Sequence, residues 1–160
     1  MTTSPTARLE ALGLVLPPVV TPLAAYVPAV RIGDQVWTSG QLPLVAGALT
    51  HSGKVGAGVT PEQAIEAART AALNGLAAAA ALAGGLDQVR AVLKVVVYVA
   101  CDPSFTAQPQ VANGASELLG AVFGDAGRHA RSAVGVAALP LDAPVEVELI
   151  VHAPLPVPAG

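Results

Sequence analysis

The segment VEVELIVH, residues 145–152, is the strongest structural signal in this chain, because every second side chain is apolar. A period of two is that of a β-strand, whose side chains point alternately to opposite faces of a sheet. We therefore expect a strand with one buried face. The buried set is Val145, Val147, Leu149 and Val151, and it alternates with Glu146, Glu148, Ile150 and His152.

Two segments on the N-terminal side of this one also have the composition of strands. Residues 89–100 contain three consecutive valines, and β-branched side chains are enriched in strands. Residues 132–138 combine small and β-branched side chains, and the connection 139–144, with its Leu-Pro pair, leads from them to the final strand. We expect a long central strand at 89–100 and a further strand at 132–138.

Two segments predict helices with one apolar face. The first opens with TPEQ, residues 60–63, in which Thr60 can cap the helix, Pro61 needs no hydrogen-bond partner, and Gln63 can complete a capping box. Gly84-Gly85 ends it. The second helix extends from about Pro109 to Phe123. The apolar stripes are Ile65, Ala68, Ala72, Leu76 and Ala79 in the first helix, and Val111, Ala115, Leu118, Leu119 and Val122 in the second.

The N-terminal third is less regular. Residues 1–22 are rich in Pro, Thr and Ala, and we interpret them as an arm able to pack on a neighbouring subunit, with a short helix at Leu9–Leu16. The remainder, 23–160, is expected to form a single domain. Its first elements are strands at 27–32 and 35–39, which form a hairpin around Gly33-Asp34. The loop that follows has room for one more short strand.

The order of these elements predicts an α+β fold. A mixed sheet with two helices packed on one face is the simplest arrangement, because each helix has one apolar stripe to bury. The other face of the sheet then needs a partner. Charged residues make up only 12% of the 160 residues, against about a quarter in ordinary soluble domains, so another copy of the chain is the expected partner.

The charge pattern excludes several classes of partner. The net charge is −3, and the charged residues are scattered without a basic run. We therefore expect no nucleic-acid binding and no attachment to an anionic membrane surface. Residues 71–86 are too short and too weakly apolar to span a bilayer, and residues 1–8 do not resemble a signal peptide, which predicts a cytoplasmic protein.

The sequence predicts neither a metal site nor a disulfide. Cys101 is the single cysteine, and we interpret it as a small buried apolar residue. His51, His129 and His152 are dispersed, so no pair has the spacing of a metal site.

Three ordered blocks of the chain resemble the YjgF-like family of reactive-intermediate deaminases. The first two are Tyr26-Val27 before the hairpin and TSGQLP, residues 38–43, after it. The third is ARSAV at 130–134, followed by Leu139-Pro140 and then VEVE at 145–148. The segment GRHARSAVGV, residues 127–136, is similar to a longer subgroup whose members are often labelled endoribonuclease L-PSP.

This resemblance implies a chorismate-mutase-like fold and a homotrimer with a barrel-like core and ligand clefts at the subunit interfaces. It also implies hydrolysis of reactive 2-imino or enamine acids to 2-oxo acids and ammonia, without a cofactor. Carried over to this sequence, the family pattern assigns Arg131 to the substrate carboxylate and Glu146 to the hydrolytic water. A guanidinium suits a carboxylate, and a carboxylate can orient a water or act as a base.

Each assignment has a structural alternative. Arg131 could instead form an ion pair with Glu146 or Glu148, which share one strand face. Tyr26 matches a tyrosine that lines the family cleft, although a tyrosine at the start of a strand can also be structural. Ser39 with Gly40 matches a turn at the cleft floor, where a glycine would let the main chain approach a ligand closely. Gln41 could be only a neighbour of that turn.

Three further positions bear on the cleft. Asn113 lies near the family's helix asparagine, but we interpret it as an amide on the surface of the helix. Ala133 stands where active deaminases often have cysteine, on the same strand face as Arg131. His129 precedes Arg131 where shorter members tend to have proline, and it could shuttle protons, extend the anion pocket or face solvent.

The sequence therefore leaves several functions open. The first is the imine deaminase. A trimer that binds small carboxylates without catalysis is the second, and Ala133 favours it. A recruited biosynthetic enzyme acting on another imine or carbonyl substrate is the third, and His129 is its support. RNA cleavage is disfavoured by the acidic charge balance. The arm and the loop 42–54 could both reshape the cleft and thereby the choice of substrate.

Overall fold

The computed structural model describes residues 4–22 and 25–155. Its elements, in chain order, are α1 (Pro5–Ala11), β1 (Ala29–Ile32), β2 (Gln35–Thr38), β3 (Leu44–Val45), β4 (Ala48–Leu49), α2 (Pro61–Ala83), the short 3-10 helix η1 (Leu86–Gln88), β5 (Ala91–Ala100), α3 (Gln108–Phe123), η2 (Gly124–Gly127), β6 (Ala130–Val136), η3 (Pro140–Asp142) and β7 (Val145–His152).

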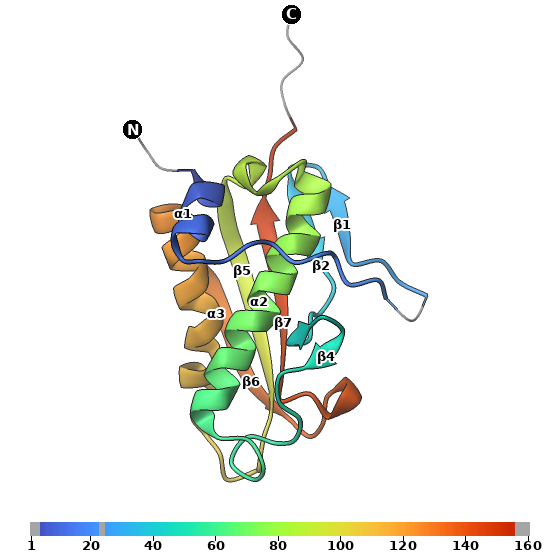
Figure 1. The fold of residues 1–160 in the computed structure, drawn as a ribbon, viewed down its shortest axis with the longest axis vertical. Coiled ribbons are helices and arrows are strands. Elements are labelled where there is room, and N and C mark those ends of the chain that lie inside the picture. The colour runs from blue at the N-terminus through green and yellow to red at the C-terminus, as the bar shows by residue number, and fades with distance from the viewer. Residues whose placement is uncertain (1–3, 23–24, 156–160) are drawn as a thin grey trace, which may run out of the picture.

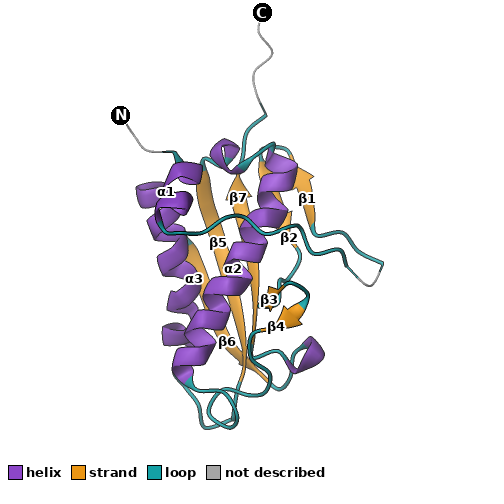
Figure 2. Cartoon of the chain, in the orientation of Figure 1, coloured by secondary structure: helices purple, strands orange, loops and turns teal. Residues whose placement is uncertain are grey.

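A five-stranded mixed sheet forms the centre of the fold, with the strand order β1-β2-β7-β5-β6. β5 and β6 are parallel, and the other neighbouring strands are antiparallel. α2 and α3 lie together on one face of the sheet (Figure 1). The α+β fold with helices on one face is thus confirmed. The extra strand expected after β2 is a separate two-stranded hairpin, β3–β4 (Figure 2).

The alternation in β7 is confirmed in full. Its four apolar residues are completely buried beneath the helices, whereas the four intervening residues are only partly buried on the opposite face. The strand lies between β2 and β5, so its buried side chains are at the centre of the core.

α2 begins and ends as its sequence predicts. The Thr60 hydroxyl accepts from the Gln63 backbone N–H at 3.2 Å, and the Gln63 side chain accepts from the Thr60 N–H at 2.9 Å. Gly84 closes the helix in the left-handed conformation, with φ of 85°. A methyl group at Gly75 would lie 2.9 Å from the side chain of Leu149, so this small residue allows α2 to approach the sheet closely.

The predicted limits of three strands were wrong by two residues. β1 begins at Ala29 rather than 27. β5 begins at Ala91 rather than 89, because residues 86–88 form η1. β6 extends from Ala130 to Val136 rather than over 132–138. Its limits follow from the parallel pairing, in which Lys94 faces Ala130 and Ala100 faces Val136. Pairing partners rather than local composition therefore set these ends.

The predicted N-terminal helix at Leu9–Leu16 was also misplaced. Helix α1 begins earlier, because the Ser4 hydroxyl caps the Ala7 N–H at 3.2 Å and Pro5 suits the first turn. It ends before Gly13, whose φ is 71°. Leu9 is buried and α1 packs on α3 of the same chain. Figure 1 shows the following segment crossing in front of α2 on its way to β1.

The sheet face opposite the helices carries exposed apolar side chains. The indole of Trp37 is 43% exposed, and its pairing with Val30 and Ile150 places these residues on the same face. Val134 on β6 and Ile32 on β1 are exposed as well. A single chain thus leaves a broad apolar surface uncovered. Within residues 4–22 and 25–155, no helix is long and apolar enough to cross a membrane.

Candidate functional site

The predicted turn at Ser39-Gly40 is a β-bulge between β2 and β7. Trp37 pairs with Ile150, and Gln41 bridges to Val147. The chain therefore advances four residues from Trp37 to Gln41 while β7 advances only three, which leaves one extra residue in the first segment. The Leu149 N–H donates instead to the Thr38 hydroxyl at 3.0 Å. Bulges of this kind redirect the chain and are common beside functional sites.

Gly40 makes room for the carboxylate of Glu146. A methyl group built on Gly40 would overlap Oε1 of Glu146 and lie 2.6 Å from its carboxyl carbon. The glycine thus permits a close approach, as the sequence suggested, although the approaching group is a side chain of the same protein.

Glu146 and Glu148 differ in their surroundings although they share one face. Burial raises the pKa of Glu146, and the neighbouring charge of Glu148 raises it further. Glu148 instead accepts a hydrogen bond from the Tyr98 hydroxyl at 3.3 Å. The structure thus distinguishes the two carboxylates, which the alternation in the sequence could not do.

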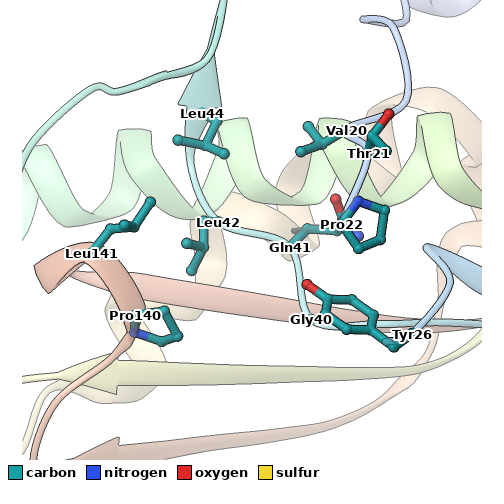
Figure 3. A pocket seen from close by; sticks show the side chains of 10 residues that line it. All are labelled: Val20, Thr21, Pro22, Tyr26, Gly40, Gln41, Leu42, Leu44, Pro140 and Leu141. Carbon is teal, nitrogen blue, oxygen red and sulfur yellow. The ribbon is translucent and has the colours of Figure 1, made fainter. Parts of the chain in front are cut away.

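A cavity of about 250 Å³ lies beside this bulge (Figure 3). Tyr26 and Gly40, which the family resemblance assigns to a cleft between subunits, both line this cavity. Ser39 does not line it. Its hydroxyl donates to the Val27 carbonyl at 2.6 Å, so Ser39 holds the segment that carries Tyr26. The complete lining consists of Val20, Thr21, Pro22, Tyr26, Gly40, Gln41, Leu42, Leu44, Pro140 and Leu141.

Arg131 lies on β6, which is an edge strand of the sheet. Its Nη1 donates to the Asn113 side-chain oxygen at 2.8 Å and to the Ser116 hydroxyl at 3.2 Å. Within the described part of the chain no carboxylate forms an ion pair with Arg131, so the alternative of a bridge to Glu146 or Glu148 is not observed in a single chain.

His129 extends this cluster through Ser116. Its Nε2 lies 2.9 Å from the Ser116 hydroxyl, and its Nδ1 lies 2.6 Å from the Gly127 carbonyl. A proton on Nδ1 would donate to that carbonyl, leaving Nε2 to accept from Ser116 while Ser116 accepts from Arg131. Ala133, which pairs with Val97 on β5, shares the face of Arg131 as predicted.

A single chain keeps the two groups of candidate residues apart. Arg131 pairs in register with Val95, which is buried beneath the helices, whereas Glu146 pairs with Tyr98 on the open face. β7 and β6 are also separated by β5. A site using both residues would have to combine the β7 side of one copy with the β6 edge of another.

Sequence reasoning missed Ser116 and undervalued Gln41. Ser116 stands three residues after Asn113, a spacing that places both on one helix face and could have identified it. Gln41 is 6% exposed and lines the cavity, so it is more than a neighbour of the turn. The contribution of Leu141 to the lining depends on the fold and had no sequence signal.

Metal-ligating side chains do not cluster in the described residues: no group of three His, Cys, Asp or Glu residues comes together there. Cys101 is buried at the end of β5, as predicted for a small apolar residue.

The raised pKa of Glu146 predicts a pH-dependent effect on stability. Because the folded state binds this proton more tightly than the unfolded state, the free energy of unfolding falls as pH rises from the ordinary value of 4.5 through the raised one. We expect Glu146→Gln to be more stable than the wild type at pH 7, with a difference that shrinks towards zero below about pH 4. Urea unfolding at equal protein concentration measures this. Equal stability at pH 7 would contradict it.

Comparison with known proteins places the chain in a family. Residues 6–152 match the model of the family described as "YjgF/chorismate_mutase-like, putative endoribonuclease". Protein TCP17 of Trypanosoma cruzi is 47% identical over 149 residues, covering 91% of this chain and 92% of its own.

Two solved structures agree in fold. Atu1372 from Agrobacterium tumefaciens, a protein described as of unknown function, has a TM-score of 0.86 at 43% identity, over 93% of this chain and 92% of its own. A protein from Shewanella oneidensis MR-1, described as "a putative endoribonuclease", has a TM-score of 0.90 at 34% identity, over 94% of this chain and 99% of its own. Together with the fold and the matching residues, these similarities show that the chain belongs to the YjgF/chorismate mutase-like family.

Proposed function

We propose that this protein hydrolyses reactive 2-imino or enamine acids to 2-oxo acids and ammonia. Arg131 binds the substrate carboxylate, and Glu146 positions the attacking water. The water oxygen bonds to the imine carbon while Glu146 accepts a water proton. Glu146 passes that proton to the nitrogen, which gives a carbinolamine. It then transfers the remaining hydroxyl proton to the same nitrogen, so that the carbon–nitrogen bond breaks and ammonia leaves as the carbonyl forms. Family membership supports this reaction class.

The observation that supports the proposal most directly is that Arg131 has only uncharged hydrogen-bond partners in the described part of the chain. Its partners are a neutral amide and a neutral hydroxyl, at 2.8 and 3.2 Å, and both bonds use Nη1. Such partners orient the guanidinium without neutralising its charge, so it can still bind a carboxylate through two hydrogen bonds. An arginine held this way at a sheet edge is better suited to an anionic ligand than to a structural ion pair.

The surroundings of Glu146 support its role as a proton carrier. Its pKa is raised by burial and by Glu148, and a general base works best when its pKa approaches the working pH. Gly40 allows the carboxylate to reach the bulge beside the cavity. Glu146 therefore combines a suitable environment with a position at the candidate site.

The proposal includes a homotrimer whose open sheet faces meet. The exposed side chains of Trp37, Val30 and Val134 on that face, and the low charge of the chain, support burial against further copies. Such an assembly would also allow the β6 edge of one copy to face the β7 side of another. Light scattering after size-exclusion chromatography measures the number of copies.

The direct test compares the wild type with Arg131→Ala. The imine is generated in place from L-alanine or 2-aminobutanoate by an amino-acid oxidase, and semicarbazide traps whatever is not hydrolysed. We expect the wild type to hydrolyse the imine faster than the spontaneous reaction does, so that less semicarbazone forms. Losing two charge-assisted hydrogen bonds should lower kcat/KM about 10- to 100-fold or more.

Arg128→Ala is the matched control, because Arg128 is an exposed arginine paired with exposed Asp125 at 3.4 Å and lies outside the cluster. It should retain wild-type activity, and all variants should form the same assembly. No acceleration by a correctly assembled wild type would refute the deaminase. Retained binding of pyruvate would then indicate a carboxylate-binding protein, and cleavage of RNA would favour the family's label.

A further inference from the structure

We propose that the cavity beside the bulge binds the side chain of the substrate and selects imino acids with a branched aliphatic chain, as derived from leucine, over the one derived from alanine. This inference rests on the proposed function and adds the identity of the substrate class. The cavity joins segments that are distant in the sequence: the arm, the β2–β3 connection and η3 (Figure 3).

The lining suits an aliphatic group. Most of the residues around the cavity are apolar, and only Thr21, Tyr26 and Gln41 have polar side-chain atoms. A water molecule occupies about 30 Å³ in the liquid, so a cavity of about 250 Å³ has space for a group much larger than a methyl. A four-carbon branched chain would displace more water and contact more of the wall than the methyl of an alanine-derived imine.

The floor of the cavity is rigid. The backbone of Gln41 pairs with Val147 through two hydrogen bonds of 2.9 Å, and its side-chain amide donates to the Ser39 carbonyl at 3.3 Å. Asn74 of α2 donates to the carbonyls of Leu42 and Leu44 at 2.9 and 3.0 Å, which ties the next part of the wall to the helix. A preformed cavity can discriminate by size, because it does not contract around a small group.

Leu141 indicates that the wall has a function. Its φ of 59° and ψ of 17° are left-handed, a conformation that disfavours leucine, and its side chain is 64% exposed. The turn is maintained from outside, since the Asp142 carbonyl accepts from the Gly53 N–H at 2.8 Å. Stability alone would favour glycine or asparagine here. A leucine that is both strained and exposed, yet lines a cavity, is explained by contact with a ligand.

The cavity is positioned to assist the proposed reaction. Gly40 lines the cavity and also contacts the Glu146 carboxylate, so Gly40 lies between the cavity and this carboxylate. A substrate with its side chain in the cavity would therefore hold its imine carbon near the bulge, within the region served by Glu146. Correct placement of this kind raises the reaction rate as well as affinity.

The experiment compares kcat/KM for the imines formed from L-leucine and L-alanine. Because each methylene in a fitted apolar pocket discriminates about 10-fold or more, we expect the leucine-derived imine to be preferred at least 10-fold. Leu141→Gly removes the side chain and also relieves the left-handed strain, so it should fold well. It should lower that preference about 10-fold, and Val20→Ala on another part of the wall should lower it in the same direction.

Val45→Ala is the matched control, because Val45 is 58% exposed in the adjacent β3–β4 hairpin and does not line the cavity. It should leave the preference unchanged. A wild type that hydrolyses both imines equally well, or Leu141→Gly and Val20→Ala variants with the wild-type preference, would overturn the inference while leaving the proposed function intact.

A binding measurement separates the two proposals. Calorimetry compares 4-methyl-2-oxopentanoate with pyruvate, the two product 2-oxo acids, without any need for turnover. Tighter binding of the larger acid that Leu141→Gly abolishes would support the cavity even if neither imine is hydrolysed, in which case only the proposed deaminase fails. Equal affinity for the two acids, or binding of neither, would overturn the inference.

Discussion

Replacing Glu146 with glutamine is expected to lower kcat for imine hydrolysis by about 10²- to 10⁴-fold, the range attributed to a positioned acid or base. Glutamine keeps the size and shape of the side chain beside Gly40 but cannot accept the water proton. The loss should appear mainly in kcat, because Arg131 still binds the carboxylate of the substrate. The measurement is the steady-state rate in the semicarbazide assay, with the same assembly confirmed for each variant.

Glu148→Gln is the matched control for this change. Glu148 has the same chemistry on the same face but bonds to Tyr98, so its loss should leave most of the activity at neutral pH. Because the charge of Glu148 raises the pKa of Glu146, Glu148→Gln should also move the acidic limb of the pH–rate profile to lower pH. Equal losses in the two variants, or a Glu146→Gln variant with wild-type kcat, would exclude Glu146 as the base.

The largest effect on stability is expected for Gly114→Ala. A methyl group at Gly114 would overlap the backbone carbonyl oxygen of Ile65, where α3 crosses α2. A backbone atom cannot rotate away as a side chain can, so the two helices would have to separate. Overpacking commonly costs about 1–3 kcal/mol, and we expect this variant at or above about 3 kcal/mol out of a typical total of about 5–15 kcal/mol.

Gly120→Ala tests whether that effect comes from packing. Gly120 is an exposed residue of the same helix, and a methyl group there would meet no atom within 4 Å. Alanine has the higher helix propensity, so this variant should gain up to about 1 kcal/mol. Urea unfolding of both variants at one protein concentration measures the difference. A Gly114→Ala variant as stable as the wild type would show that the helices can move apart at little cost.

Local patterns predicted the elements of this fold well. The alternation of β7 and the capping box of α2 appear in the structure as the sequence indicated, because each depends on residues within a few positions of one another. The limits of β6 were missed because they depend on pairing with β5, and α1 was misplaced because Ser4 and Pro5 start it earlier than its apolar residues suggest.

The candidate site was predictable only in part. Family resemblance named Arg131, Glu146, Tyr26 and Gly40, and chemistry gave each a role. The sequence did not show that Ser116 connects Arg131 with His129, because Ser116 is on a different element. For the same reason it did not show that residues 20–22 of the arm and η3 line one cavity.

The amino-acid sequence alone was sufficient for the class of fold, the buried face of β7, the ends of α2 and the family, because these follow from short-range periodicity, capping and residue identity. Three-dimensional packing was needed to distinguish Glu146 from Glu148, to place Arg131 on an edge strand and on the opposite sheet face from Glu146, and to assemble the cavity at Leu141. The physical reason is that strand order, the one-residue bulge and contacts between distant segments result from pairing and burial across the whole chain, which local propensities do not encode.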